Sequence, residues 1–226
     1  MKRLIIFACI LAGTFSAHRA LACTGITLHT ANNYPVTART IEWAATPLHA
    51  MYVIVPRGQQ QRSFLPDGTL AGKTFTAKYG YVGISVENDA FVMEGINEAG
   101  LGVGLFYFPQ YGEYQPYDPQ KKEQSVSDMQ LAAWILSSFA SINELQAAMP
   151  QIRVIATDPR ASTVHWRITE SSGRQVVLEI VNQHVHFYEN PLGVLTNSPD
   201  FGWHLTNLNN YVNLSAGSIN HRQVGR

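Results

Sequence analysis

The sequence predicts one α+β domain in which β-sheets are layered around a short helical region. Apolar runs of strand length, bounded by turn residues, fill residues 24–108 and 162–196. Between them, apolar residues recur at helical spacing over residues 125–150. No internal repeat, low-complexity segment or linker interrupts this order, so we expect a single domain over residues 23–226.

The first 22 residues differ from the rest of the chain. Met1–Arg3 carries positive charge, Leu4–Ala12 is apolar, and Ala20–Ala22 (ALA) supplies the small residues that signal peptidase accepts. We therefore expect residues 1–22 to be a signal peptide that is cleaved after Ala22, and a periplasmic or secreted mature protein. No later apolar run has the roughly 18 residues that a spanning helix needs, so stable membrane insertion is not expected.

Six segments of the N-terminal half have the alternating or apolar pattern of strands: Thr24–Thr30, Tyr34–Ile41, Met51–Val55, Tyr81–Val86, Ala90–Glu94 and Leu101–Phe108. The glycines at 100, 102 and 104 lack the spacing and the following helix of a dinucleotide-binding loop. Closely packed strands are therefore the preferred interpretation of these glycines.

The middle of the chain predicts two helices. Ser125–Phe139 has apolar residues at helical spacing, with Asp128 near its start. Ser141–Glu144 is a capping box that begins a second, shorter helix, which ends at Pro150.

Strands resume after the helices at Ser162–Thr169, Gln175–Val181, His184–Tyr188 and Gly193–Thr196. His184 and His186 would share one face of a strand, but no third ligand is spaced to join them. We therefore expect no metal site there.

The charge balance and the cysteines narrow the possible functions. Basic and acidic residues number 16 each, which gives no reason to expect a nucleic-acid partner. Of the two cysteines, signal cleavage would remove Cys9. Cys23 would remain and would become the first residue of the mature chain. Its α-amine, with an ordinary pKa of about 7.7–8.0, would then stand beside its own thiol. Cys23 would thus supply a nucleophile and a base in one residue.

Two other interpretations of Cys23 stay open. The thiol of a lipoprotein carries a lipid, but lipoprotein signals usually have Leu at position −3, and here Ala20 is at −3 and Leu21 at −2. A buried structural thiol is the other alternative. We rank the nucleophile first, the lipid anchor second and the structural thiol third.

Aromatic residues cluster at and after the strand that ends at residue 108: Tyr107, Phe108, Tyr111, Tyr114 and Tyr117. They either pack in the core and loops or line a pocket for an apolar ligand.

Four motifs follow one another along residues 23–214: Cys23–Gly25 (CTG), Ala38–Trp43 (ARTIEW), Gly95–Gly102 (GINEAGLG) and Gly193–Pro199 (GVLTNSP). Together they resemble the choloylglycine hydrolase and penicillin V acylase family of linear amide hydrolases. The resemblance implies the αββα four-layer sandwich of the N-terminal-nucleophile hydrolases.

The resemblance also implies roles for individual residues. Cys23 is the nucleophile and its α-amine is the base. Arg39 lies beside the thiol, where a fixed cation favours the thiolate. Glu42 stands where family members commonly have Asp, in contact with that amine. Asn197 and the backbone N–H of Tyr107 hold the oxyanion.

The pocket and substrate follow from the same resemblance. Trp43 resembles the secreted Gram-negative branch, where an aromatic residue at this place shapes the pocket. The place of Tyr107 is Tyr in known penicillin V acylases and Asn in many bile salt hydrolases. With Phe108, both residues would line the substrate pocket. The implied activity is hydrolysis of an N-acyl amide of the penicillin V, acyl-homoserine lactone or conjugated bile acid type, through a thioester and with no cofactor. A homotetramer is a common assembly in the family.

The family pattern also contains a later arginine in an Ala-Ser-Arg-type motif, which does not occur before Arg226. We therefore expect a C-terminally incomplete form of the fold. A lipid-anchored periplasmic binding lipoprotein and a catalytically inactive fragment of the family are the alternatives to an enzyme.

Overall fold

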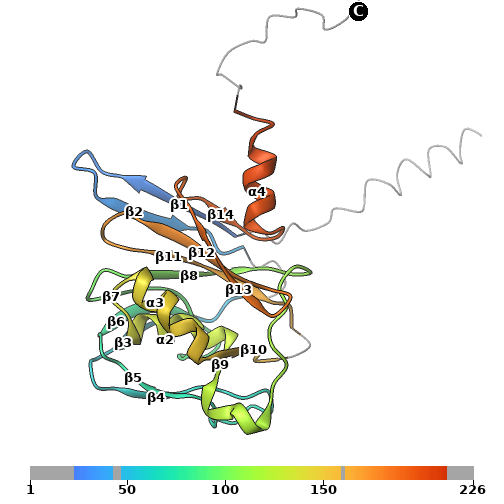
Figure 1. The fold of residues 1–226 in the computed structure, drawn as a ribbon. Helices are drawn as coiled ribbons and strands as arrows, with labels where there is room; N and C mark the ends of the chain where they lie inside the picture. The colour runs from blue at the N-terminus through green and yellow to red at the C-terminus, as the bar shows by residue number, and fades with distance from the viewer. Residues whose placement is uncertain (1–22, 43–46, 159–160, 213–226) are drawn as a thin grey trace, which may run out of the picture.

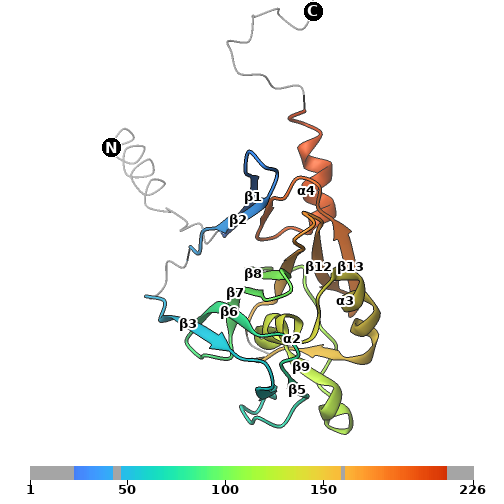
Figure 2. The same ribbon diagram turned by 90° about the vertical axis from the view of Figure 1, so that its left-hand side faces the viewer.

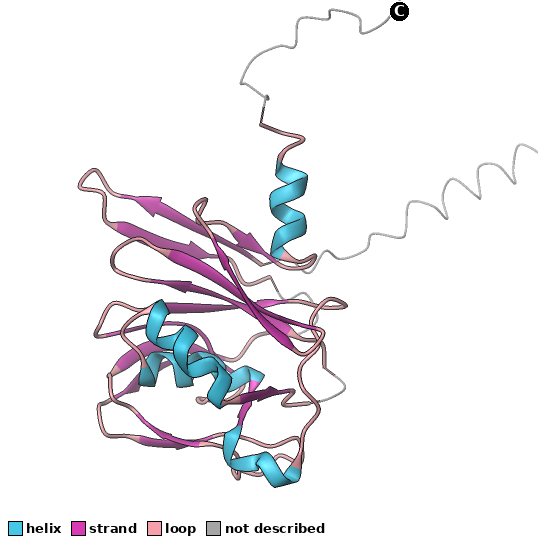
Figure 3. Ribbon diagram, viewed as in Figure 1, coloured by secondary structure: helices cyan, strands magenta, loops and turns pink. Residues whose placement is uncertain are grey.

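The computed structural model describes residues 23–42, 47–158 and 161–212. The predicted signal peptide and Trp43 lie outside these residues. In the described part, a large antiparallel sheet has two helices on one face and a smaller sheet on the other (Figures 1 and 2). The predicted α+β class is confirmed, and Figure 3 shows how strands outnumber helices.

The large sheet has seven strands in the order β13-β12-β11-β8-β7-β6-β3. In chain order these strands are β3 (Ala50–Val55), β6 (Tyr81–Val86), β7 (Val92–Asn97), β8 (Gly102–Tyr107), β11 (Val164–Thr169), β12 (Gln175–Val181) and β13 (His184–Glu189). The small sheet has the order β14-β1-β2, from β1 (Thr24–His29), β2 (Pro35–Arg39) and β14 (Leu195–Thr196).

The remaining elements are short. The α-helices are α2 (Leu131–Ser138), α3 (Ile142–Ala148) and α4 (Phe201–Leu208), and the 3₁₀ turns are η1 (Pro119–Gln124), η2 (Asp128–Gln130) and η3 (Met149–Gln151). Two strand pairs complete the described structure: β4 (Gln60–Arg62) with β5 (Thr74–Thr76), and β9 (Ser125–Ser127) with β10 (Arg153–Ile155).

The two-residue period of the strands gives the large sheet two different faces. On β8, Val103 and Leu105 point into the main core under α2, whereas Phe106 joins the cluster that contains Cys23. On β11, Trp166 and Ile168 belong to the main core. The intervening positions, His165 and Arg167, therefore point to the side on which β1 lies.

The helix predicted over Ser125–Phe139 begins only at Leu131, so this boundary was wrong. Residues 125–127 instead form β9, in parallel pairing with β10. The Asp128 carboxylate explains the difference, because its Oδ1 accepts from the Thr157 backbone N–H at 2.9 Å and from the Thr157 hydroxyl at 2.6 Å. These contacts hold the segment against β10 before the helix starts.

The N-cap predicted at Ser141 is confirmed at the start of α3, and the return contact of Glu144 goes to the residue before the cap. Ser141 Oγ accepts from the Glu144 backbone N–H at 3.2 Å, while Glu144 Oε2 accepts from the Ala140 N–H at 2.9 Å. The sequence pattern missed β4, β5 and β10, which have three residues each and therefore show no period. It also missed α4, which is as long as α2.

Candidate active site

Cys23 lies directly before β1 and is buried, with 7% of its surface exposed. It packs in a small cluster with Phe106, Leu195 and Phe201, between the two sheets. The Thr196 hydroxyl on β14 donates to the Cys23 carbonyl oxygen at 2.8 Å. The first residue after the predicted cleavage point is thus held in the protein interior by β14.

Gly25 allows β1 to approach the large sheet. A Cβ atom at this position would lie 2.6 Å from Phe106 Cζ and 2.7 Å from Arg167 Nη1. Both distances are too short for any side chain to fit without displacing its neighbours. The glycine of the CTG motif therefore allows Cys23 to come close to the large sheet.

Cys23 also opens onto a cavity of about 430 Å³. Most of its wall is apolar, and its lining residues are Cys23, Ile41, Glu42, Leu48, Val86, Glu87, Met93, Leu105, Tyr107 and Met129. The volume and apolar wall are typical of a site that binds a small organic group. A nucleophile at the wall of such a cavity is the arrangement that acyl transfer requires.

Arg39 binds the backbone of two residues that line this cavity. Its Nη1 donates to the backbone carbonyls of Met93, at 3.2 Å, and of Leu105, and both of these residues line the cavity. The guanidinium also lies over the Phe106 ring, 4.2 Å from the centroid. Arg39 is thus fixed at the interface between the sheets, and its place beside the Cys23 thiol stays a prediction.

Glu94 on β7 balances the buried positive charge. Its Oε1 lies 3.3 Å from Arg167 Nη2 and its Oε2 lies 3.6 Å from Arg39 Nη1. Burial nevertheless raises the pKa of the Glu94 carboxyl above its ordinary value, and the two arginines offset only part of this effect. Burial likewise lowers the pKa of Arg167.

Glu42 connects to the nucleophile segment through Thr40. Its Oε1 accepts from the Thr40 hydroxyl at 3.0 Å, and Thr40 Oγ1 accepts from the Thr24 backbone N–H at 3.2 Å. Glu42 is therefore linked to the residue after Cys23 and lines the same cavity. Its contact with a free α-amine stays a prediction.

The two predicted oxyanion groups meet in the structure. The backbone N–H of Tyr107, at the end of β8, donates to Asn197 Oδ1 at 3.2 Å. Asn197 directly follows β14, whose Thr196 contacts Cys23. Residues 90 positions apart are thus brought together next to the nucleophile.

The predicted aromatic pocket residues have different positions. Tyr107 lines the cavity, and its hydroxyl donates to Ser162 Oγ at 2.8 Å. The prediction for Phe108 was wrong, because its side chain is fully buried and stacks on His165 at a centroid distance of 4.4 Å. The strand alternation explains this, since Phe108 and Tyr107 point in opposite directions.

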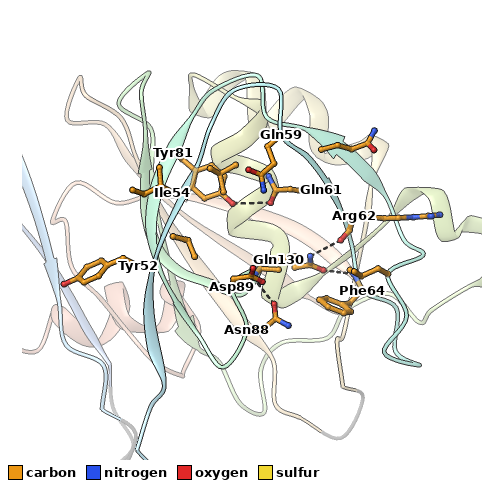
Figure 4. A pocket seen from close by; sticks show the side chains of 15 residues that line it. Tyr52, Ile54, Gln59, Gln61, Arg62, Phe64, Tyr81, Asn88, Asp89 and Gln130 are labelled. Atoms are coloured by element: carbon orange, nitrogen blue, oxygen red, sulfur yellow. Dashed lines mark hydrogen bonds between the residues drawn. The ribbon is translucent and has the colours of Figure 1, made fainter.

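A larger cavity of about 610 Å³ is lined by residues of β3 and β4 and by Tyr81, the residues at 88–90 and Gln130. Figure 4 shows Gln61, Tyr81 and Gln130 among its lining residues. These polar groups are paired within the protein: the Tyr81 hydroxyl donates to Gln61 Oε1 at 3.2 Å, and Gln130 Nε2 donates to the Arg62 carbonyl at 3.2 Å. Among the described residues that line it, none is Cys, Ser or Thr. The cavity at Cys23 is therefore the candidate active site.

Sequence reasoning missed three buried polar residues near the site, His165, Arg167 and Glu179. It also missed the half-buried Glu94, which pairs with Arg167 and Arg39. In the segment Val164–Thr169 (VHWRIT), His and Arg alternate with Val, Trp and Ile. This pattern normally predicts a polar face in contact with solvent, so the burial of His165 and Arg167 is visible only in the structure.

Within the described residues, no three His, Cys, Asp or Glu side chains are grouped so that they could hold a metal ion. In the same part of the chain, no helix combines the length and the apolar composition that crossing a membrane requires.

Comparison with known proteins places these features in one family. The pattern of the linear amide C–N hydrolases, choloylglycine hydrolase family, matches residues 23–226. A bile salt hydrolase/transferase from Clostridium perfringens is 28% identical over 90% of this chain and 61% of its own length. A penicillin V acylase from Pectobacterium atrosepticum is 28% identical over 93% of this chain and 58% of its own length.

Solved structures agree with this assignment. A conjugated bile acid hydrolase from Clostridium perfringens superposes with a TM-score of 0.72 at 28% identity, over 87% of this chain and 60% of that protein. The N-terminal-nucleophile hydrolase fold expected from the motifs is thereby confirmed. The chain spans about three fifths of the length of these relatives.

Proposed function

The chain belongs to the choloylglycine hydrolase family of linear amide C–N hydrolases, and on this premise we propose that it is an exported cysteine amidohydrolase. Its substrates are the linear amides of N-acyl compounds. The observation that carries the proposal is the position of Cys23 at an apolar cavity beside Tyr107, whose N–H contacts Asn197. These residues provide a nucleophile, an acyl pocket and an oxyanion site.

In the first half of the reaction, the Cys23 thiolate attacks the amide carbonyl and a carbon–sulfur bond forms. The carbonyl oxygen becomes an oxyanion, which the Tyr107 N–H stabilises. A half-turn of the Asn197 amide replaces Oδ1 by Nδ2 and supplies a second donor. The carbon–nitrogen bond then breaks, and the leaving amine takes a proton from the Cys23 α-ammonium.

In the second half, water hydrolyses the thioester. The α-amine, now neutral, takes a proton from the water as it attacks the thioester carbonyl. The carbon–sulfur bond breaks, the acid leaves and the thiolate is restored. Signal cleavage activates the enzyme in this scheme, because it creates the α-amine.

The cavity favours substrates with an apolar acyl group. The Ile41, Met93 and Leu105 side chains contribute to a wall in which Glu42 and Glu87 are the charged members. An aryl, fatty or steroid acyl group suits this wall better than a charged one. Penicillin V, acyl-homoserine lactones and conjugated bile acids are the three substrate classes to compare.

The test joins N-terminal sequencing of the exported protein with hydrolysis of these three classes. We expect an N-terminus at Cys23, alkylation of its thiol by iodoacetamide and loss of hydrolysis after alkylation. A diacylglyceryl adduct on Cys23, or full hydrolysis by the Cys23→Ala variant, would contradict the proposal.

Assembly and export need measurements of their own. Light scattering of the purified mature chain tests the homotetramer that the family resemblance suggests. Fractionation of expressing bacteria tests export, and we expect the mature chain outside the cytoplasm.

A further inference from the structure

Two ionisable side chains are enclosed between the sheets without a role in the reaction above. His165 on β11 and Glu179 on β12 have side chains with no exposed surface. His165 Nδ1 lies 3.0 Å from Glu179 Oε1. Enclosing both groups costs solvation free energy, which two apolar residues of similar size would not lose. The pair therefore contributes something that apolar packing does not.

The second ring nitrogen of His165 contacts the segment that carries Asn197. His165 Nε2 lies 2.9 Å from the backbone carbonyl oxygen of Thr196. A carbonyl oxygen only accepts hydrogen bonds, so Nε2 must carry a proton and donate it. The Nδ1–Oε1 contact likewise holds one proton between two atoms, whichever of them is the donor.

The ring cannot turn away from these partners. Phe108 stacks on it at a centroid distance of 4.4 Å and an angle of 8°, and Phe106 meets it edge-on at 6.3 Å. The imidazole is thus fixed in the plane that joins Glu179 and Thr196. This gives the fully buried Phe108 a physical role, although it does not line the substrate pocket.

Glu179 contacts the other end of the same segment. Its Oε1 also accepts from the backbone N–H of Phe201 at 2.9 Å. The His165–Glu179 pair therefore holds residues 196–201 at both ends, and Asn197 lies between the two contacts. Thr196 in turn donates its hydroxyl to the Cys23 carbonyl oxygen at 2.8 Å.

We propose that His165 and Glu179 are positioning residues that fix the oxyanion amide of Asn197 relative to Cys23. The proposal rests on the proposed function, because the role of Asn197 does. Neither side chain touches the substrate. The pair acts on the transition state through the Thr196 carbonyl, by fixing where the next residue places its amide.

The kinetic test compares His165→Asn with His165→Gln in the full chain. The Gln amide is long enough to donate to the Thr196 carbonyl, whereas the shorter Asn amide replaces only the contact with Glu179. The same two exchanges at His184, an exposed residue of β13, are the matched controls.

We expect His165→Asn to lower kcat on an N-acyl amide by about 100-fold or more, as the loss of one oxyanion contact does. KM and the rate of Cys23 alkylation by iodoacetamide should stay within about threefold, because alkylation forms no oxyanion. His165→Gln should recover most of kcat. The proposal is overturned if His165→Asn keeps its kcat, if kcat and alkylation fall together, or if Gln recovers nothing.

A second measurement does not depend on activity or on a variant that folds. In NMR of the wild-type chain labelled with nitrogen-15 at histidine and carbon-13 at the threonine carbonyls, one ring Nε2–H should be protected from exchange with solvent. Its assignment to His165 follows from its coupling to the Thr196 carbonyl carbon. An unprotonated Nε2 on His165 would overturn the proposal. If the protected Nε2–H of His165 is present but the chain hydrolyses no N-acyl amide, the result contradicts the proposed function and leaves the contact of His165 with Thr196 intact.

Discussion

The two faces of the seven-stranded sheet are held by different chemistry. Toward α2, the sheet presents apolar side chains such as Leu105 and Trp166, which are almost completely buried. Toward β1, the sheet presents the polar side chains of His165, Arg167 and Glu179, which are equally buried, beside a small apolar cluster that includes Phe106 and Val177. The small sheet itself is much more open, and Leu28 is 59% exposed.

This difference suggests that one face of the sheet mainly stabilises the fold and the other mainly positions the site residues. Apolar burial is non-directional and supplies most of the free energy of folding. Hydrogen bonds and ion pairs of buried groups are directional and contribute little net stability. The α2 face should therefore determine whether the chain folds, and the β1 face should determine where Cys23 and Asn197 lie. Four variants test this division, in order of decreasing expected effect.

The largest effect concerns the nucleophile. Cys23→Ala should lower hydrolysis at least about 10³-fold, since only binding and oxyanion stabilisation remain. It should change the melting temperature little, because it removes one sulfur atom from a small cluster. Initial rates and thermal melts on the same preparation check both parts. A large loss of stability would show that the β1 face also supports folding.

A core variant should show the opposite behaviour. Leu136→Ala on α2 empties a fully buried site and should cost about 2–5 kcal/mol of unfolding free energy. Urea denaturation measures the loss. The kcat of the remaining folded protein should be unchanged, and Leu70→Ala, at a residue that is 52% exposed, is the control. A fall in kcat would show that the two faces are coupled.

Gly25→Ala tests the place where the two sheets touch. The added methyl group would collide with Phe106 and Arg167, so we expect a loss of about 1–3 kcal/mol from overpacking. Displacement of β1 should also lower kcat, unlike in the Leu136 variant. Urea denaturation and kcat, measured at the same temperature, test both expectations. If neither the unfolding free energy nor kcat changes, β1 can move away from the large sheet without cost.

The smallest effect is a pH dependence that arises from Glu94. Its ordinary pKa is 4.5, and burial raises the pKa in the folded state. The folded chain therefore retains a proton that the unfolded chain loses, and the unfolding free energy falls as pH rises from 4.5 through the raised pKa. Glu94→Gln should flatten this part of the stability curve. If the unfolding free energy of the variant falls equally steeply with pH, groups other than Glu94 cause the slope.

The sequence predicted the features that depend on local pattern. Strand alternation located β6, β8 and β12, and the motif around Ser141 located the start of α3. Short elements such as β10 were missed because three residues show no period. The start of α2 was misplaced because the tertiary contacts of Asp128 with Thr157 overrode a helical pattern.

The motifs singled out Cys23, Arg39 and Asn197 from the sequence. The structure places all three at the interface between the sheets, and their catalytic roles stay predictions. The pairing of His165 with Glu179 was not accessible from sequence, because it depends on the register of β11 against β12 and on the path of residues 196–201. The single domain over residues 23–226 and the export signal stay predictions.

The most direct test of the proposed mechanism is mass spectrometry of an acid-quenched reaction between the mature protein and an N-acyl amide. We expect a transient acyl adduct, as a thioester, on the peptide that begins with Cys23, and none in the Cys23→Ala variant. Hydrolysis that proceeds with no adduct, or with an adduct on another residue, would contradict it.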